Sequence, residues 1–439
     1  MLKSVIVGGV HPSYRKGLSF SRAIEDAPVP PKVSIPLSQH LGAPATPVVT
    51  KGDEVTPGML LAEAPKLISA NVHSPVAGKV KSIVNNPMPG GSLADYIEIE
   101  TDVDATVAHH WQTQDVDLSA VDRKWLSRTM REAGIVGMGG ATFPTDVKYS
   151  PPPTAKLDTF ILNGAECEPY LTCDHRMMVE KAAEVLRGIA LVRAAFSFDR
   201  VIIAIEKNKP DAIEAFRQAL RAAEEPDIEV ASLNVLYPQG AEKMLIKAVT
   251  GRTVPAGGLP FEVGVVVSNV QTIFALYEAA YLGKPLVQRV LTISGAGIRE
   301  PKNIRALVGT PIADLVDFCG GYSEETTKVV AGGPMTGTAL PTLEYSVTKG
   351  LSGLLFLTQK DFPDELPCIH CGRCVDVCPM RLMPLKLAAF AKAGKFEEAK
   401  ATNLADCFEC GSCAWGCPSH IRLVSWIKYA KNYIRVKGI

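Results

Sequence analysis

Short apolar runs alternate with turn residues through the first hundred positions. Residues 33–37, 51–60 and 72–80 each place apolar side chains beside glycine, proline, aspartate or serine. Strands interrupted so regularly by turn formers are typical of a small β-barrel or β-sandwich. We therefore expect residues 1–115 to form an all-β domain.

Helical and strand-like periods alternate in the middle of the chain. Apolar side chains recur at helical spacing over residues 125–133, 210–223 and 242–249, and Pro210 suits the first turn of its helix. Strand-like runs occupy residues 156–162, 200–205, 229–233 and 263–267. The alternation predicts an α/β domain over residues 116–285.

The remaining chain predicts two smaller units. Residues 286–350 turn strand-like again, with a short helix over residues 311–318, and fit a β-grasp-like module. Residues 358–366 are expected to link this module to a C-terminal domain of residues 360–439. That domain should be helical over residues 385–401 and again after Ile421. Packing of this last helix on its own domain is the simpler interpretation, and docking on a membrane partner is the alternative.

Composition narrows the class of protein. The 439 residues include 46 basic and 46 acidic side chains, so no bulk charge favours nucleic acid. The N-terminal apolar run is too short for a signal peptide, and no run approaches the roughly 18 residues of a membrane helix. We therefore expect a soluble or peripheral protein without a transmembrane segment of its own.

Eight of the 11 cysteines lie in two copies of the pattern C-x2-C-x2-C-x3-C-P, at residues 368–379 and 407–418. Three closely spaced thiolates can bind one [4Fe–4S] cluster, and in two-cluster proteins the fourth cysteine ligates the other cluster. One cluster is expected on Cys368, Cys371, Cys374 and Cys417. The other is expected on Cys407, Cys410, Cys413 and Cys378. Zinc sites prefer two separated ligand pairs, and disulfides need a secreted protein, so both alternatives fit less well. Because clusters are assembled in reducing compartments, we expect a cytoplasmic location.

A glycine-rich segment, residues 134–144, precedes the first strand of the α/β domain. Gly137, Gly139 and Gly140 let backbone N–H groups approach a phosphate closely, and Phe143 can stack on a ring. A helix precedes the segment instead of a strand, so it is not a dinucleotide fingerprint. A simple turn is the alternative interpretation.

Polar residues follow the predicted strands, where ligands of open α/β sheets bind. The first strand ends in Asn163, Glu166 and Glu168, which supply an amide and two carboxylates. These groups can bind ribose hydroxyls or a carboxamide, and a solvated acidic turn is the alternative. Two later strand ends offer similar groups for a polar ring system, at Gly240, Glu242, Asn269 and Thr272.

With these residues assembled, the chain resembles the C subunits of the Rnf (Rsx) electron-transport complexes over nearly its whole length. The middle domain is also similar to the flavin subunit of respiratory complex I. That family has G-R-G-G-A-G-F-P-T where this chain has G-M-G-G-A-T-F-P-T from Gly137, and N-A-D-E-S-E-P where this chain has N-G-A-E-C-E-P from Asn163. The first acid of the second motif is Ala165 here. The N-terminal part resembles lipoyl and biotinyl carrier domains, but Leu67 stands where they carry the modified lysine, so we expect a scaffold.

The resemblance implies four domains. They are a barrel-sandwich hybrid over 1–115, a Rossmann-like FMN/NADH domain over 116–285, a β-grasp, SLBB-like module over 286–350, and an α-helical two-cluster ferredoxin domain over 360–439.

The resemblance also assigns roles within the site. The glycines and Lys148 would hold the FMN phosphate and ribityl chain, and Asn163 and Asn269 would touch the flavin. Glu166 and Phe143 would face the nicotinamide nucleotide. FMN would exchange a hydride with NAD(H), and the clusters would carry single electrons.

The implied protein is a peripheral subunit on the cytoplasmic face of the bacterial inner membrane. Its partners would be the membrane and ferredoxin-accepting subunits of an Rnf-type complex, which couples ferredoxin:NAD oxidoreduction to Na+ or H+ transport. One alternative is a soluble FMN and iron–sulfur reductase that uses NADH, for example one serving cobalamin. The other is a two-cluster relay whose α/β domain is only a scaffold.

Overall fold

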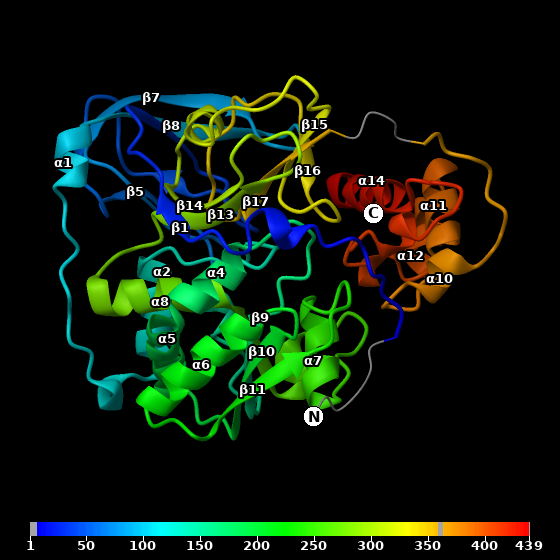
Figure 1. Cartoon of the computed structure of the whole chain (residues 1–439), viewed down its shortest axis with the longest axis horizontal. Helices are drawn as coiled ribbons and strands as arrows, with labels where there is room; N and C mark the ends of the chain where they lie inside the picture. The colour runs from blue at the N-terminus through cyan, green and yellow to red at the C-terminus, as the bar shows by residue number, and fades with distance from the viewer. Residues whose placement is uncertain (1–6, 359–362, 439) are drawn as a thin grey trace.

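The computed structural model describes residues 7–358 and 363–438. The N-terminal residues that argued against a signal peptide lie largely outside the described residues, as do residues 359–362 of the linker expected over residues 358–366. Four structural units follow one another along the chain (Figure 1), and the cluster domain, coloured orange to red, lies at one side of the molecule. No helix in the described ranges is long and apolar enough to cross a membrane.

The N-terminal domain is a sandwich of two antiparallel sheets. One sheet has the order β2 (Lys32–Pro36), β8 (Leu93–Thr101), β7 (Gly78–Pro87) and β4 (Glu54–Val55). The other has the order β3 (Thr46–Pro47), β5 (Leu60–Glu63) and β6 (Val72–His73). Alternate residues such as Val33, Ile35, Ile97 and Ile99 are fully buried between the sheets, as a period-two pattern predicts. Helix α1 (Val103–Val107) and the short helix η2 (Leu118–Ala120) lead to the next domain.

The α/β domain has a parallel sheet in the order β11 (Ile228–Leu233), β10 (Arg200–Glu206), β9 (Thr159–Gly164) and β12 (Val265–Asn269). Strand β9 begins and ends later than the predicted 156–162. It ends later because both neighbouring strands pair with Asn163, β10 through Ala204 and β12 through Asn269. This pairing extends the hydrogen-bonded ladder to the carboxyl edge of the sheet.

Helices cover both faces of this sheet. Phe160 and Leu162 face one layer of helices, whereas Ile161 faces the other side. The first layer contains α2 (Arg123–Glu132), α4 (Cys173–Glu180), α5 (Ala182–Ala195), α6 (Pro210–Ala222) and α8 (Val270–Leu282). Helix α7 (Glu242–Thr250) packs on the opposite face, and α3 (Thr145–Lys148) follows the glycine-rich segment. A short helix, η3 (Pro260–Val263), leads into β12.

The third unit is a six-stranded sheet that also includes segments outside the predicted residues 286–350. Its order is β1 (Ile24–Asp26), β14 (Lys302–Leu307), β13 (Gln288–Ser294), β17 (Gly353–Leu357), β15 (Lys328–Ala331) and β16 (Thr338–Leu340). Helix α9 (Ile312–Phe318) covers it, as predicted. Strand β1, from before the module in sequence, pairs with β14, and β17, from after it, pairs with β13. Both strands cover hydrogen-bonding edges that residues 286–350 would leave open by themselves.

The C-terminal domain is helical. Its helices are α10 (Arg373–Asp376), α11 (Pro384–Lys392), α12 (Phe396–Ala401), η4 (Leu404–Asp406), α13 (Ser412–Trp415) and α14 (Leu423–Lys437). Helix α14 buries Leu423, Ile427 and Ala430 against its own domain, as the helical spacing predicted.

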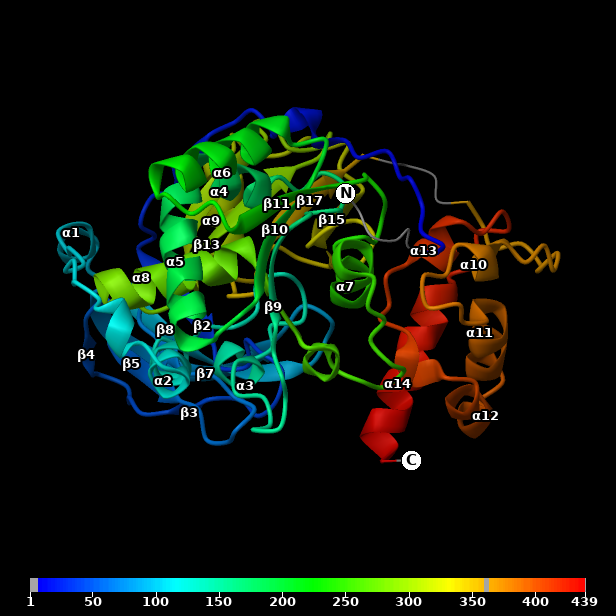
Figure 2. The same ribbon diagram turned by 90° about the horizontal axis from the view of Figure 1, so that it is seen from below.

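The described part of the N-terminal segment, residues 7–22 with the short helix η1 (Lys16–Leu18), belongs to none of these units. In both views it leaves the cluster domain and runs across the α/β domain toward β1 (Figures 1 and 2). We call residues 7–22 the strap.

Candidate functional site

The site lies where the strand order of the α/β sheet reverses. The chain forms β9, β10 and β11 outward in one direction and then returns to place β12 on the other side of β9. Crevices at such switch points, beyond the carboxyl ends of the strands, are where α/β sheets bind ligands. Asn163 lies at the carboxyl end of β9 and Asn269 ends β12, so both amides stand at this point.

The glycine-rich segment closes over the crevice as a loop. The Gly137 N–H donates to the Phe143 carbonyl at 2.9 Å, which ties the loop's two ends together. The Met138 N–H donates to Thr272 Oγ1 on α8 at 3.0 Å, and a Cβ at Gly139 would lie 3.0 Å from Asn269 Cβ. Gly139 and Gly140 are exposed, and a Cβ at Gly140 would meet nothing within 4 Å. The loop therefore rests on the end of β12 and presents bare backbone to solvent.

Further predicted residues lie around the same crevice. Asn163 Nδ2 donates to the Gly240 carbonyl at 2.8 Å, and Lys148 on α3 forms an ion pair with Glu242 at the start of α7. Both ionic side chains stay partly exposed. The structure thus brings together the glycine-rich loop and residues from β9, α3, α7 and α8, all of which the sequence assigned to one site.

Glu166 is part of this site but its carboxylate is already engaged. One oxygen accepts from the Asp174 N–H at 2.7 Å and the other from the His175 N–H at 3.2 Å, so the side chain caps the start of α4. Glu166 itself has a φ of 46°, a left-handed conformation that needs such support. Any contact with a nucleotide must use the carboxylate's remaining lone pairs.

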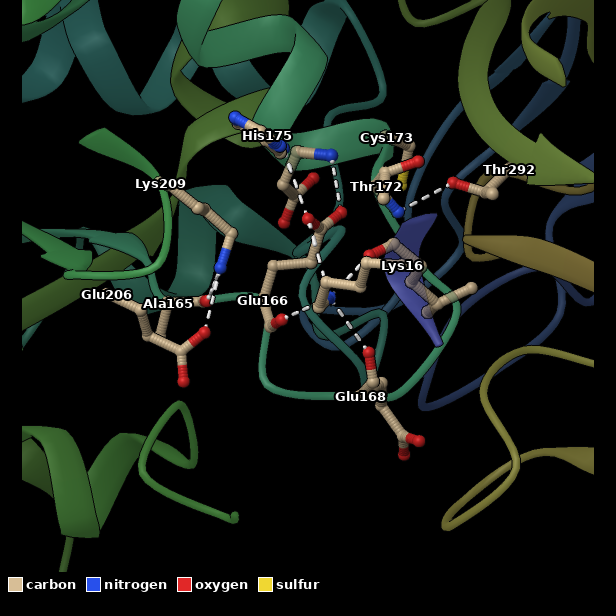
Figure 3. A network of polar contacts seen from close by, with 12 residues as sticks. Lys16, Ala165, Glu166, Glu168, Thr172, Cys173, His175, Glu206, Lys209 and Thr292 are labelled. Atoms are coloured by element: carbon tan, nitrogen blue, oxygen red, sulfur yellow. Dashed lines mark hydrogen bonds and ion pairs between the residues drawn. The ribbon is translucent and has the colours of Figure 1, made fainter. Parts of the chain in front are cut away.

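Lys16 of the strap reaches into the acidic loop, which we define as residues 165–172 between β9 and α4 (Figure 3). Its Nζ donates to the carbonyls of Glu166, Glu168 and Leu171, at 2.8, 3.0 and 2.5 Å, and lies 3.9 Å from the Glu166 carboxylate. Burial lowers the pKa of Lys16, and the Glu166 charge opposes that shift. All three ammonium donors are used inside the protein, so Lys16 ties three points of the loop together.

The Glu168 carboxylate is bound by residues that follow β15. It accepts from the Met335 N–H at 3.1 Å and from the Thr336 hydroxyl at 2.5 Å. Gly333 makes room for it, since a Cβ there would clash with Glu168 Oε2. Burial raises the pKa of this carboxyl. Glu168 therefore joins the acidic loop to the six-stranded sheet's domain.

Two further buried charged residues lie at the site. Asp174 accepts from Asn269 Nδ2 at 2.6 Å and from Gln271 Nε2 at 2.7 Å, and burial together with the Glu166 charge raises its pKa to about 6. Arg289, on β13, donates to the Met138 carbonyl of the glycine-rich loop at 2.9 Å. Its Nη1 has no hydrogen-bond partner among the described residues, although the side chain is 1% exposed. The sequence did contain one indication that Arg289 has a special role, because it is a charged residue within the otherwise largely apolar strand 288–294.

The cysteine runs form two cavities with crossed membership. One cavity, which we call the outer cavity, is lined by Cys368, Cys371, Cys374 and Cys417. The other, the inner cavity, is lined by Cys378, Cys407, Cys410 and Cys413. Cys368 and Cys371 are exposed, whereas Cys378 and Cys413 are buried. Each cavity therefore gathers three cysteines of one run and the last cysteine of the other, the arrangement that the spacing predicted.

The chemistry of the inner cavity fits a metal cluster. Burial raises the pKa of the Cys407 thiol to about 11, and that of Cys413 is also raised. Four thiolates in so buried a place need compensating positive charge, which soft iron centres supply.

The inner cavity adjoins the α/β domain. The Tyr237 hydroxyl donates to the Cys410 carbonyl at 2.7 Å, and Tyr237 begins the loop that carries Gly240 and Glu242. Met380 and Phe408 pack near Met244 of α7. Figure 2 shows α7 between the parallel sheet and the cluster domain. The inner cavity is thus the nearer one to the crevice, and the outer cavity opens to the surface.

Lys349 joins the barrel to the segment that leads into the glycine-rich loop. Its Nζ donates to the Asn71 and Gly134 carbonyls at 2.6 and 2.7 Å, and burial lowers its pKa to about 7. Among the described residues no carboxylate pairs with it, and the pKa values of the facing His40 and His73 are lowered too. The unfolded chain, with a lysine pKa of about 10.4, binds more protons above pH 7 than the folded chain does.

We therefore expect the unfolding free energy of the wild type to rise with pH between about 7 and 10, by up to ~1.4 kcal/mol per pH unit from this group. Lys349→Met should lose that slope relative to the wild type, whereas the matched exposed substitution Lys66→Met should keep it. Denaturant unfolding at a series of pH values checks this, and equal slopes in wild type and Lys349→Met would contradict it.

The crevice at the strand-order reversal is of the kind that binds nucleotides, and two cavities beside it are each lined by four cysteines. Together these sites define the class of electron-transfer proteins that hold a nucleotide-like cofactor and two metal clusters. The chain is 46% identical, over all of its length and 95% of the relative's, to the C subunit of a proton-translocating ferredoxin:NAD(+) oxidoreductase complex of Clostridium ljungdahlii. It belongs to the RnfC family, the C subunits of ion-translocating oxidoreductase complexes. The predicted family and order of domains are confirmed.

Other relatives agree. Identity is 42% to the C subunit of a Na(+)-translocating ferredoxin:NAD(+) oxidoreductase complex of Acetobacterium woodii, covering 97% of this chain and 96% of that one. It is 41% to the C subunit of an ion-translocating oxidoreductase complex of Rhodobacter capsulatus, covering 97% and 82%.

Family models match in the order of the domains. They are the RnfC barrel sandwich hybrid domain over residues 4–104, the Nuo51 FMN-binding domain over 130–278, the SLBB domain over 290–339 and the 4Fe-4S dicluster domain over 367–421. An air-oxidised NAD+-reducing [NiFe]-hydrogenase shares the fold, with a TM-score of 0.50 and 18% identity over 73% of this chain and 69% of that one.

The residues present fit FMN. The glycine-rich loop offers exposed backbone at Gly139 and Gly140, and Lys148 offers a partly exposed ammonium group on the same side. The unpartnered Nη1 of Arg289 and the amides of Asn163 and Asn269 suit a polar ring system.

Proposed function

We propose that this chain exchanges hydride between NAD(H) and FMN and passes single electrons through two [4Fe–4S] clusters to or from membrane subunits. When bound, FMN interconverts two-electron and one-electron transfer, and the clusters carry one electron at a time. The supporting observation is the contact between Tyr237 and Cys410, which joins the crevice loop to the inner cavity.

The chain's own residues supply position and charge. We infer that Gly137, Gly139, Gly140 and Lys148 hold the phosphate and ribityl chain, because the loop exposes its backbone at Gly139 and Gly140 and Lys148 supplies a partly exposed cation. Asn163, Asn269, Thr272 and the 240–242 loop would orient the ring from the strand ends, since each is already fixed by a neighbour in the crevice.

Glu166 and Phe143 are proposed to face the nicotinamide nucleotide. Phe143 is half-buried at the end of the glycine-rich loop, where its ring can stack. Glu166 is held rigidly by Lys16 and by the start of α4, which suits a group that must orient a ligand.

The cysteine cavities suggest the order of transfer. Cys378, Cys407, Cys410 and Cys413 would hold the cluster nearer the flavin. Cys368, Cys371, Cys374 and Cys417 would hold the cluster that meets partners, because two of these cysteines are exposed at the surface.

The proposed partners are the membrane and ferredoxin-accepting subunits of an Rnf-type complex on the cytoplasmic face of the bacterial inner membrane. The whole complex would couple ferredoxin:NAD oxidoreduction to Na+ or H+ transport. The relatives named for such complexes match this chain over nearly its full length, which supports this assignment over the soluble reductase.

The test is an assay of the anaerobically purified chain after reconstitution with FMN, iron and sulfide. NADH should bleach the flavin absorption and then reduce the clusters, as followed by electron paramagnetic resonance. NADPH serves as the comparison. A chain that binds no flavin, or whose clusters NADH leaves oxidised, would count decisively against the proposal.

A further inference from the structure

The strap contacts the backbone beside the inner cavity. The Gly9 N–H donates to the Val377 carbonyl at 2.9 Å, immediately before Cys378. Gly8 has a φ of 73°, and a Cβ there would lie 2.9 Å from the carbonyl groups of Val377 and Cys378. Only glycine fits so close to this backbone, so the contact is built for residues without side chains.

The next residues of the strap pair with the crevice loop. Val10 and Tyr237 exchange two backbone hydrogen bonds, at 2.8 and 3.0 Å. A Cβ at Gly9 would lie 2.8 Å from the Tyr237 carbonyl. Because the Tyr237 hydroxyl in turn reaches the Cys410 carbonyl, three segments distant in sequence meet at one point: strap, crevice loop and inner cavity.

The strap then anchors in the acidic loop. The Tyr170 N–H donates to the Tyr14 carbonyl at 2.7 Å, and Lys16 binds three carbonyls of the same loop. Ser19 Oγ lies 2.8 Å from Thr172 Oγ1, and both residues are fully buried. The strap is therefore fixed on the α/β domain at its far end and on the cluster domain at its near end.

Other contacts also join the cluster domain to the rest of the described chain. The Gly257 N–H donates to the Asp406 carboxylate, and Met380 and Phe408 make the apolar contact near α7. A Cβ at Gly411 would lie 2.8 Å from the Met335 carbonyl. The strap binds both the backbone beside a cluster cysteine and the loop that carries Gly240 and Glu242.

We propose that the strap is a positioning element for electron transfer, which holds the inner cavity at a fixed separation from the crevice. This inference rests on the proposed function. Electron exchange between two centres falls steeply as their separation grows, so an element that fixes the separation also fixes the rate of exchange. Gly8 and Gly9 set that separation through close backbone contacts that a side chain would push apart.

The experiment compares Gly8→Val and Gly9→Val with Gly17→Ala in the reconstituted chain. Gly17 lies on the same strap, and a Cβ there would meet nothing within 4 Å, which makes it the matched control. After rapid mixing with NADH, flavin bleaching should keep its wild-type rate in all three variants. Cluster reduction should slow by roughly tenfold or more in the two valine variants only.

A second measurement does not depend on turnover. Amide hydrogen exchange should become faster at residues 8–11 and around Tyr237 in the valine variants, and stay unchanged in β10. If a valine variant does not fold, the alanine variant at the same position, Gly8→Ala or Gly9→Ala, is used in its place. Alanine adds a smaller side chain at the same backbone contacts.

The outcomes separate the two proposals. Wild-type flavin that NADH does not bleach would contradict the proposed function. Wild-type bleaching together with full-speed cluster reduction in the glycine variants would overturn only the role of the strap. Loss of iron from the alanine variants would also overturn it, since the strap would then be needed to build the cluster and not to place it.

Discussion

Cys378→Ser is expected to remove the cluster of the second cysteine run and leave that of its own run intact. Cys378 lines the inner cavity with Cys407, Cys410 and Cys413, and serine is a poor ligand for soft iron. The variant should keep about half of the wild-type iron. Because the inner cavity adjoins Tyr237, reduction of the remaining cluster by NADH should nearly cease, although dithionite should still reduce it.

Cys417→Ser should give the complementary result. It should also keep about half of the iron, but it should lose the outer cluster and retain rapid NADH-dependent reduction of the inner one. Iron analysis and electron paramagnetic resonance of the dithionite-reduced variants distinguish the two. Cys319→Ala is the control, because Cys319 lies in the core of the six-stranded sheet and should leave the iron content unchanged. If Cys378→Ser removed the same centre as Cys371→Ser, the crossed assignment would fail.

Glu166→Gln is expected to weaken NADH binding by roughly 10- to 100-fold while FMN and iron are retained. Both carboxylate oxygens accept hydrogen bonds from backbone N–H groups at the start of α4. In glutamine one oxygen is replaced by an NH2 group, which cannot accept a hydrogen bond from the N–H that it faces. Losing one such hydrogen bond in a buried place costs about 1–3 kcal/mol, which the acidic loop would relieve by moving. The buried Lys16 would also lose its nearby negative charge.

The measurement is the NADH concentration that gives half-maximal flavin bleaching. Glu229→Gln, at the opposite end of the parallel sheet and partly exposed, should match the wild type. An unchanged NADH dependence in Glu166→Gln would instead favour the relay hypothesis, in which the α/β domain is a scaffold for the clusters.

Local sequence patterns predicted most of the helices and strands. Helices α6, α7 and α9 and strands β10 and β11 lie within a residue or two of their predicted bounds, because their apolar periods and turn residues act over short distances. Pairing across the sheet extended β9, and the six-stranded sheet recruited β1 and β17 from outside its predicted range. Strand pairing joins segments far apart in sequence, so a local pattern does not reveal it.

The sequence by itself determined the family, the order of the domains and the grouping of eight cysteines, because ligand spacing and glycine-rich and acidic motifs are local properties of the chain. The tertiary structure decided which charges meet. Glu168 accepts a hydrogen bond from Met335, Arg289 donates one to the glycine-rich loop, and Lys16 donates to the acidic loop. The tertiary structure also brought Gly9 between Val377 and Tyr237. Such contacts depend on how whole domains pack, since a buried charge or a bare glycine finds its partner only when distant segments fold together.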